Sequence, residues 1–274
     1  APYSTIGGGV ENYAEGEASF VGGGTNNQSS GLYSSVVGGY RNTASGGSAT
    51  VGGGYLNTAG GVAAAVGGGQ GNAAMAFAAA VGGGFQNLVA TDRATVAGGY
   101  GHYVNGYAAT VGGGGSNYAS GAYATVAGGY QNIASGQYSS VGGGYSNTVS
   151  GLYAAVPGGA LNFATDLAFA AGYRAKANHP GAFVWGDYTF ADIASTNANS
   201  VTFRASGGYR LFSNSGMSVG VYLAPASGSW TSMSDRNAKE DFQPVNVVEV
   251  LEKVAALPVT TWRYKSQDPS IRHI

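Results

Sequence analysis

The sequence contains no cysteine, and only 9% of its 274 residues are charged. The lack of cysteine excludes disulfide bonds and thiolate metal sites. The charged fraction is far below the roughly 25% of ordinary globular chains. A net charge of −1 gives no electrostatic reason to expect nucleic acid or an anionic membrane as a partner. No apolar run approaches the ~20 residues of a transmembrane helix, so we expect no membrane span.

The few charges are unevenly distributed. Between residues 21 and 160 only Arg41, Asp92 and Arg93 are charged, whereas residues 234–274 contain 12 charged residues. This shift predicts a boundary near residues 230–234. We expect a repeat domain at 1–180, a small β neck or cap at 181–233, and a distinct region at 234–274. Because the sequence begins without Met or a signal pattern and ends without a polar tail, we expect a removed leader or an excised piece.

Glycine is abundant, at 50 of 274 residues, and it recurs in a 15-residue repeat. Each repeat has a valine, a Gly-Gly pair two residues later, and an asparagine six residues after the valine. The valines are Val21, Val36, Val51, Val66, Val81, Val96, Val111, Val126, Val141 and Val156. The asparagines are Asn27, Asn42, Asn57, Asn72, Asn87, Asn117, Asn132, Asn147 and Asn162, with His102 once in their place. The register extends back to Ile6 and fades near residue 177.

A strict period of 15 with one glycine pair predicts an all-β solenoid, in which each coil has two short strands and two turns. Helix is disfavoured because every window of one period contains Gly-Gly, and each interior glycine costs about 1 kcal/mol. Collagen is excluded because glycine does not occupy every third position. Valine and alanine provide a thin core for a coil of this length. We therefore expect several copies of the chain to share a core.

The coil pattern Ala-x-Val-x-Gly-Gly-x-x-Asn-x-Ala-x-Gly over residues 6–177 resembles the heads of trimeric autotransporter adhesins. The resemblance implies a left-handed parallel β-roll in which three chains wind side by side. The sequence differs from that family in being richer in glycine and tyrosine and in keeping a period of 15. A particular adhesive ligand is therefore not carried over.

The region after residue 181 has a different pattern. Alternation and aromatic content predict strands at residues 183–185, 200–205, 209–212 and 217–223. Asn246 followed by Glu249 resembles a capping box. Five apolar residues from Val247 to Ala255 then form one helical face, which ends before Pro258. A further strand is expected at residues 259–264, so the tail is predicted to be α+β.

Residues 234–239 (Ser-Asp-Arg-Asn-Ala-Lys), the following helix, and residues 258–264 and 271–274 resemble the start of the intramolecular chaperone of the endosialidase type. The resemblance implies a domain that assists trimer assembly and then cuts itself off, with most of it beyond Ile274. It also implies that Ser234 is the nucleophile and Lys239 its base, with cleavage at Met233–Ser234. A lysine activates a serine hydroxyl when burial lowers the lysine pKa. The ordinary alternative is an N-cap serine and a solvated lysine.

Two kinds of side-chain column are candidates for binding. The asparagine column is favoured as a hydrogen-bonded ladder at a turn over a polar binding stripe. Tyrosines form two interrupted columns. Such columns could bind sugars or partner proteins, or they could pack one chain against another. The first column is Tyr40, Tyr55, Tyr100, Tyr130 and Tyr145, and the second is Tyr33, Tyr123, Tyr138 and Tyr153.

The sequence gives little indication of phosphate binding, glycoside hydrolysis or metal binding. The glycine turns lack the lysine of a phosphate-binding loop, and the solenoid lacks paired carboxylates for glycoside hydrolysis. The histidines His102, His179 and His273 are too scattered to form a metal site in one chain. We therefore expect no cofactor, no metal and no multiple-turnover enzyme.

The leading hypothesis is a homotrimeric extracellular fibre or adhesin of the bacterial surface. It would bind a host-surface protein or glycan, and its rods could join end to end. A phage tail fibre in a virion is the first alternative, because the same tail serves both. An ice- or mineral-binding solenoid is the second. The column before the valines is irregular for that role, since Thr50, Ala65, Ala80 and Thr95 alternate without a fixed pattern.

Overall fold

The computed structural model describes residues 1–233, 241–258, 260–262, 265, 268, 270 and 272. The chain divides into two compact units, residues 1–206 and residues 207–274. The first unit contains two long parallel sheets, and the second contains a small antiparallel sheet and a helix.

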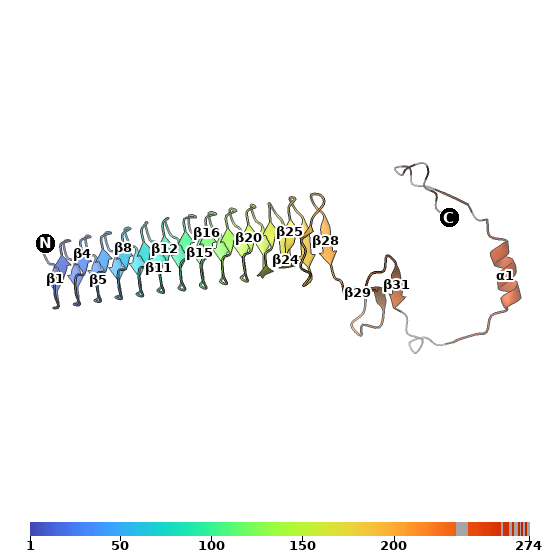
Figure 1. The fold of residues 1–274 in the computed structure, drawn as a ribbon, viewed down its shortest axis with the longest axis horizontal. Helices are drawn as coiled ribbons and strands as arrows, with labels where there is room; N and C mark the ends of the chain where they lie inside the picture. The colour runs from blue at the N-terminus through green and yellow to red at the C-terminus, as the bar shows by residue number, and fades with distance from the viewer. Residues whose placement is uncertain are drawn as a thin grey trace. The chain divides into compact units, whose positions relative to one another are not determined.

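The first unit is a parallel β-solenoid, in which every coil contributes one short strand to each of two sheets (Figure 1). The 15-stranded sheet consists of β1 (Thr5–Ile6), β3 (Phe20–Val21), β5 (Ser35–Val36), β7 (Thr50–Val51), β9 (Ala65–Val66), β11 (Ala80–Val81), β13 (Thr95–Val96), β15 (Thr110–Val111), β17 (Thr125–Val126), β19 (Ser140–Val141), β21 (Ala155–Val156), β22 (Gly159–Ala160), β24 (Phe169–Tyr173), β26 (Phe183–Gly186) and β28 (Val201–Arg204).

The 13-stranded sheet consists of β2 (Tyr13–Ala14), β4 (Gln28–Ser29), β6 (Thr43–Ala44), β8 (Thr58–Ala59), β10 (Ala73–Ala74), β12 (Leu88–Val89), β14 (Tyr103–Val104), β16 (Tyr118–Ala119), β18 (Ile133–Ala134), β20 (Thr148–Val149), β23 (Phe163–Ala164), β25 (Ala175–Ala177) and β27 (Ile193–Ala194). Residues of neighbouring strands pair in register, as Val36 does with Val51. These sheets confirm the prediction of an all-β parallel solenoid whose regular coils follow the period of the sequence. The left hand and the trimer remain predictions.

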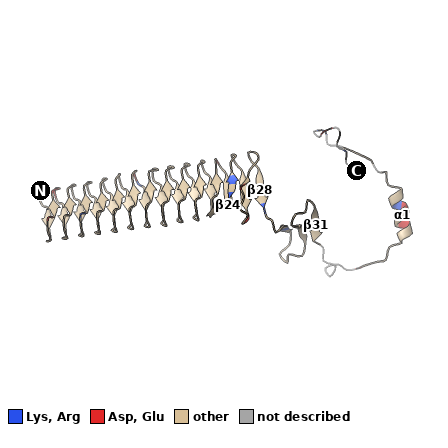
Figure 2. Ribbon diagram, in the orientation of Figure 1, with Lys and Arg blue, Asp and Glu red and all other residues tan. Residues whose placement is uncertain are grey.

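The core of the solenoid is narrow. Every buried apolar side chain among the described residues belongs to valine or alanine. The ten valines of the repeat have at most 1% of their surface exposed, and they point inward from the first sheet. Alanine, valine or serine points inward from the second sheet, as at Ala44 and Ala59. Charged side chains are sparse along this unit (Figure 2).

The second glycine of each Gly-Gly pair is required by the geometry, whereas the first is required only in a few pairs, as at Gly53, where φ is +147°. At Gly84 the backbone has φ +97°, and a Cβ there would lie 2.0 Å from the carbonyl oxygen of Gly99 in the next coil. It would also lie 2.8 Å from Nδ2 of Asn87 in its own coil. At Gly83 the nearest atom to a Cβ is 3.9 Å away. The second glycine therefore makes room both for the next coil and for the asparagine side chain.

The regular period of the 15-stranded sheet stops after β21, but both sheets continue past residue 180. Ala155 pairs with Phe169, Phe169 with Phe183, and Phe183 with Val201. The first two of these coils are therefore slightly shorter than the repeat, and the third is longer. Strand pairing tolerates such changes in coil length because the turns absorb them. A search of the sequence for a constant period misses coils whose length changes. The strands predicted at residues 183–185 and 200–205 are therefore solenoid strands, β26 and β28.

The second unit contains a three-stranded antiparallel sheet of β29 (Tyr209–Phe212), β30 (Gly220–Leu223) and β31 (Trp230–Met233). β30 is shorter than the predicted strand because the side-chain oxygen of Asn214 accepts hydrogen bonds from the amides of Ser218 and Val219, forming a turn. The helix α1 (Val247–Ala255) is present, and the Asn246 side chain caps its first turn as expected. Half of the strand predicted at residues 259–264 lies outside the described residues.

Candidate functional site

The asparagine column forms a continuous ladder inside the solenoid. The side chain of Asn72 is fully buried. Its Nδ2 donates to the carbonyl oxygens of Gly68 and Gly84, at 2.9 Å and 2.8 Å. Its Oδ1 accepts a hydrogen bond from the backbone amide of Asn87 in the next coil, at 3.0 Å. Because all of its hydrogen-bonding groups face protein, this column joins coil to coil and offers no groups to a ligand.

His102 replaces asparagine in this ladder and performs only part of its role. Its Nδ1 accepts from the amide of Asn117 at 3.1 Å, and its own amide donates to Oδ1 of Asn87 at 3.1 Å. The ring is 1% exposed, and Nε2 makes no hydrogen bond in the described part of the chain. Burial lowers the pKa of His102 below its ordinary value. The neutral imidazole is therefore the form that fits the ladder.

The tyrosine columns lie on the surface. In the first column Tyr40 and Tyr55 stack with ring centroids 5.5 Å apart, and Tyr130 stacks on Tyr145 at 6.1 Å. In the second column Tyr123, Tyr138 and Tyr153 stack at 5.1 Å and 5.0 Å. The exposed fractions of the first column range from 37% to 49%. The structure thus assembles both predicted columns, and their contact with a ligand or with another chain stays a prediction.

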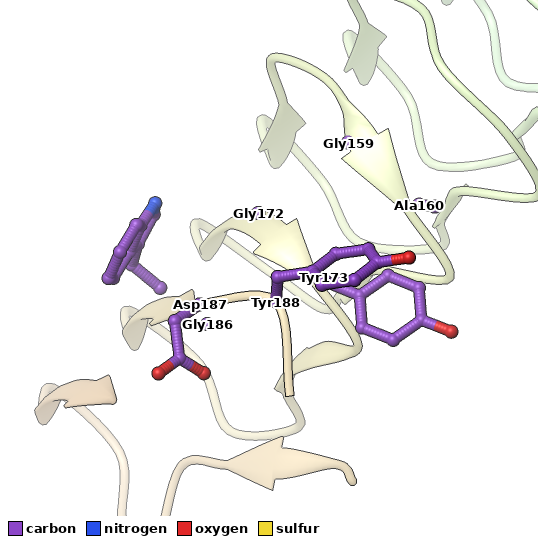
Figure 3. A pocket seen from close by; sticks show the side chains of 8 residues that line it. Gly159, Ala160, Gly172, Tyr173, Gly186, Asp187 and Tyr188 are labelled. Atoms are coloured by element: carbon purple, nitrogen blue, oxygen red, sulfur yellow. The ribbon is translucent and has the colours of Figure 1, made fainter. Parts of the chain in front are cut away.

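An aromatic groove, which the sequence pattern did not predict, lies where the coils change length. Its cavity volume is about 370 Å³. Its floor is bare backbone from two successive coils, at Gly159 and Gly172. Figure 3 shows Tyr173 and Tyr188 side by side at this site, and their ring centroids are 5.6 Å apart.

Two further rings belong to the same surface. Trp185 lines the groove and is 38% exposed. Phe190 is 75% exposed and contacts Tyr173 edge-on, at 5.3 Å between centroids. Tyr188 is 80% exposed. The sequence signal for this groove is the run Trp-Gly-Asp-Tyr at residues 185–188, which begins at the end of β26 and lies outside the regular repeat.

The carboxylate of Asp187 also lines the groove, and its partners hold it in place. Its Oδ1 accepts from Nε of Arg204 at 2.8 Å, and its Oδ2 accepts from the amide of Ser206 at 2.7 Å. The hydrogen bonds from Ser206, Thr189 and Arg204 hold the pKa of Asp187 far below its usual range. Asp187 is therefore ionised at neutral pH, and the guanidinium of Arg204 balances its charge.

A serine–histidine pair elsewhere in the solenoid has a structural role. Oγ of Ser195 lies 2.8 Å from Nδ1 of His179 and accepts a hydrogen bond from the amide of Asn178 at 3.0 Å. Ser195 is only 5% exposed, so a substrate cannot approach its hydroxyl. Among the described residues no group of three histidine, cysteine, aspartate or glutamate side chains is placed to hold a metal ion.

The predicted cleavage residues Ser234 and Lys239 lie outside the described residues. The described chain reaches the expected scissile position at Met233, the last residue of β31. Ser234 and Lys239 as nucleophile and base therefore remain a prediction. The part of the chain that the structure describes contains no helix with the length and apolar character of a membrane span.

Comparison with known proteins identifies the C-terminal segment. Residues 234–274 match the model of the family described as Chaperone of endosialidase. A comparison with curated proteins gives no match. The chain thus joins a parallel β-solenoid of about 13 turns to the start of a chaperone-of-endosialidase domain, a combination that fits a structural protein of the fibre or tailspike type.

Proposed function

We propose that this chain is the rod of a homotrimeric extracellular fibre, of the adhesin type, whose C-terminal domain assists assembly of the trimer. The observation that carries the proposal is the order of the parts, a long uniform solenoid followed by the chaperone match at residues 234–274. A rod of near-identical coils has a specific assembly problem. Three such chains pair almost equally well in many registers, and a folding domain at one end selects the correct one.

The surface of the solenoid supports association between copies of the chain. Buried apolar side chains no larger than valine provide little hydrophobic stabilisation for so many ordered residues. Larger apolar side chains stand on the outside instead, including Leu32, Phe77 and Leu152, which occupy the same position of three coils and are 39% to 48% exposed. A shared interface would remove this surface from water.

The mass of the protein in solution tests the trimer. We expect three times the chain mass from size-exclusion chromatography with light scattering, both with and without the region after Met233. The trimer should persist without that region because, in this proposal, the chaperone assists assembly but does not hold the finished rod together. A monomer in both samples would remove the trimer and the fibre with it.

Self-cleavage is tested in the full-length protein that carries this sequence. We expect a fragment that begins at Ser234. The lysine-activated hydroxyl attacks the carbonyl of Met233 and converts the peptide bond to an ester, and water then hydrolyses the ester and releases the fragment. Ser234→Ala should abolish the fragment, whereas the neighbouring Ser232→Ala in β31 should leave it unchanged. Intact-mass spectrometry reads the result. A wild type that yields no fragment would contradict this part of the proposal.

A phage tail fibre is the second candidate, and the same solenoid and chaperone match favour it equally. In that case the protein would be located on a virion rather than on the bacterial surface. Immunogold labelling of cells and of purified particles from the source distinguishes the two locations.

A further inference from the structure

We infer that the aromatic groove at Tyr173, Trp185 and Tyr188 binds an uncharged saccharide. This goes beyond the fibre proposed above and does not rest on it. The groove follows the first tyrosine column, since Tyr145 pairs with Ala160 and Ala160 with Tyr173, and it opens where the coils become unequal in length.

The shape of the groove fits a sugar ring. Its floor at Gly159 and Gly172 carries no side chains, so a flat ligand can lie on the backbone there. Its volume of about 370 Å³ is at the small end of the roughly 300–1,000 Å³ range of ligand sites. A protein loop or helix would need a much larger apolar surface than this to bind stably.

The chemistry of the groove also fits a sugar. The faces of aromatic rings carry partial negative charge and attract the C–H groups that a pyranose presents on one face. The lining of the groove is almost entirely apolar, so recognition rests on the ring faces of Tyr173, Tyr188 and Trp185. The carboxylate of Asp187 already accepts hydrogen bonds from Arg204 and Ser206, so it adds no uncompensated charge beside the rings.

The electrostatics decide against a cationic ligand. Aromatic rings beside a carboxylate also form cages for quaternary ammonium groups. Such a cage requires an uncompensated negative charge. Here Nε of Arg204 lies 2.8 Å from Oδ1 of Asp187, and the pair is mostly buried, with side-chain exposures of 22% and 15%. The site therefore has no net charge and suits a neutral polyol.

The test uses the full chain and three neutral trisaccharides, chitotriose, cellotriose and maltotriose, with choline as the cationic probe. Saturation-transfer NMR detects binding, and calorimetry measures Kd. We expect at least one trisaccharide to bind in the millimolar range or more tightly. Tyr188→Ala, at a residue that is 80% exposed, should weaken binding by about tenfold or more without affecting the fold. The matched control is Tyr153→Ala in the second tyrosine column. Tyr153 is 57% exposed, and this variant should bind the trisaccharide as the wild type does.

Three results would overturn the inference. The first is that no trisaccharide binds at tens of millimolar. The second is that choline alone binds, which would indicate an ammonium cage. The third is that Tyr153→Ala weakens binding as much as Tyr188→Ala. Acrylamide quenching of the Trp185 fluorescence, obtained by difference with Trp185→Phe, adds a check. A shielded Trp185 together with absent binding would assign the groove to contact between chains.

Discussion

Replacing Asn72 by alanine tests whether the asparagine ladder holds neighbouring coils together. In the wild type, this side chain makes three hydrogen bonds to backbone groups, two from its Nδ2 and one at its Oδ1. The backbone amide of Asn72 itself bonds to Asn57 and is unaffected by the change. The substitution therefore removes contacts that join its own coil to the following one.

The loss of stability in Asn72→Ala depends on which polar groups are left without a hydrogen-bond partner. The carbonyl of Gly84 also accepts from the amide of Gln70 at 2.9 Å, so it remains satisfied. The carbonyl of Gly68 and the amide of Asn87 lose the partners that Asn72 provided. Each buried group left unpaired costs about 1–3 kcal/mol, so we expect Asn72→Ala to destabilise the solenoid by about 2–6 kcal/mol.

The control is Gln70→Ala, which removes the same amide group from an exposed position two residues earlier. A surface change of this kind should stay within about 0.5 kcal/mol. Denaturant unfolding followed by far-UV circular dichroism gives the stabilities. Hydrogen exchange at the amide of residue 87 gives a local reading, which should accelerate only in Asn72→Ala. Equal stability of the two variants would refute the structural role of the ladder.

Two further predictions concern single positions of the repeat. His102→Asn should stabilise the protein by about 1–2 kcal/mol, because an asparagine Nδ2 can donate where Nε2 has no partner. Since burial lowers the pKa of His102 below 6.5, the wild type should lose stability as the pH falls below that value, and urea unfolding across pH should show no such loss in His102→Asn. Gly84→Ala should destabilise by about 2–6 kcal/mol through strain and close contact, while Gly83→Ala should have little effect on the unfolding midpoint. An unchanged unfolding midpoint in Gly84→Ala would contradict the close spacing of neighbouring coils at this position.

The sequence alone determined the architecture of the regular coils. A valine, a glycine pair and an asparagine at constant spacing can satisfy parallel strand pairing only by stacking each coil on the next, because identical residues then lie in register. The inward valines, the ladder at Asn72 and the stacked tyrosines such as Tyr123 and Tyr138 all follow from that one periodicity. The cap at Asn246 followed from local helix chemistry.

Only the tertiary structure decided the features that depend on unequal spacing. The sheets continue through coils of unequal length because hydrogen bonding acts on the strands and leaves the turn length free. Those changes bring Tyr173, Trp185 and Tyr188 to one groove and place Arg204 of the next coil against Asp187. No period in the sequence links these residues, since each contact arises from how one irregular coil lies on the next.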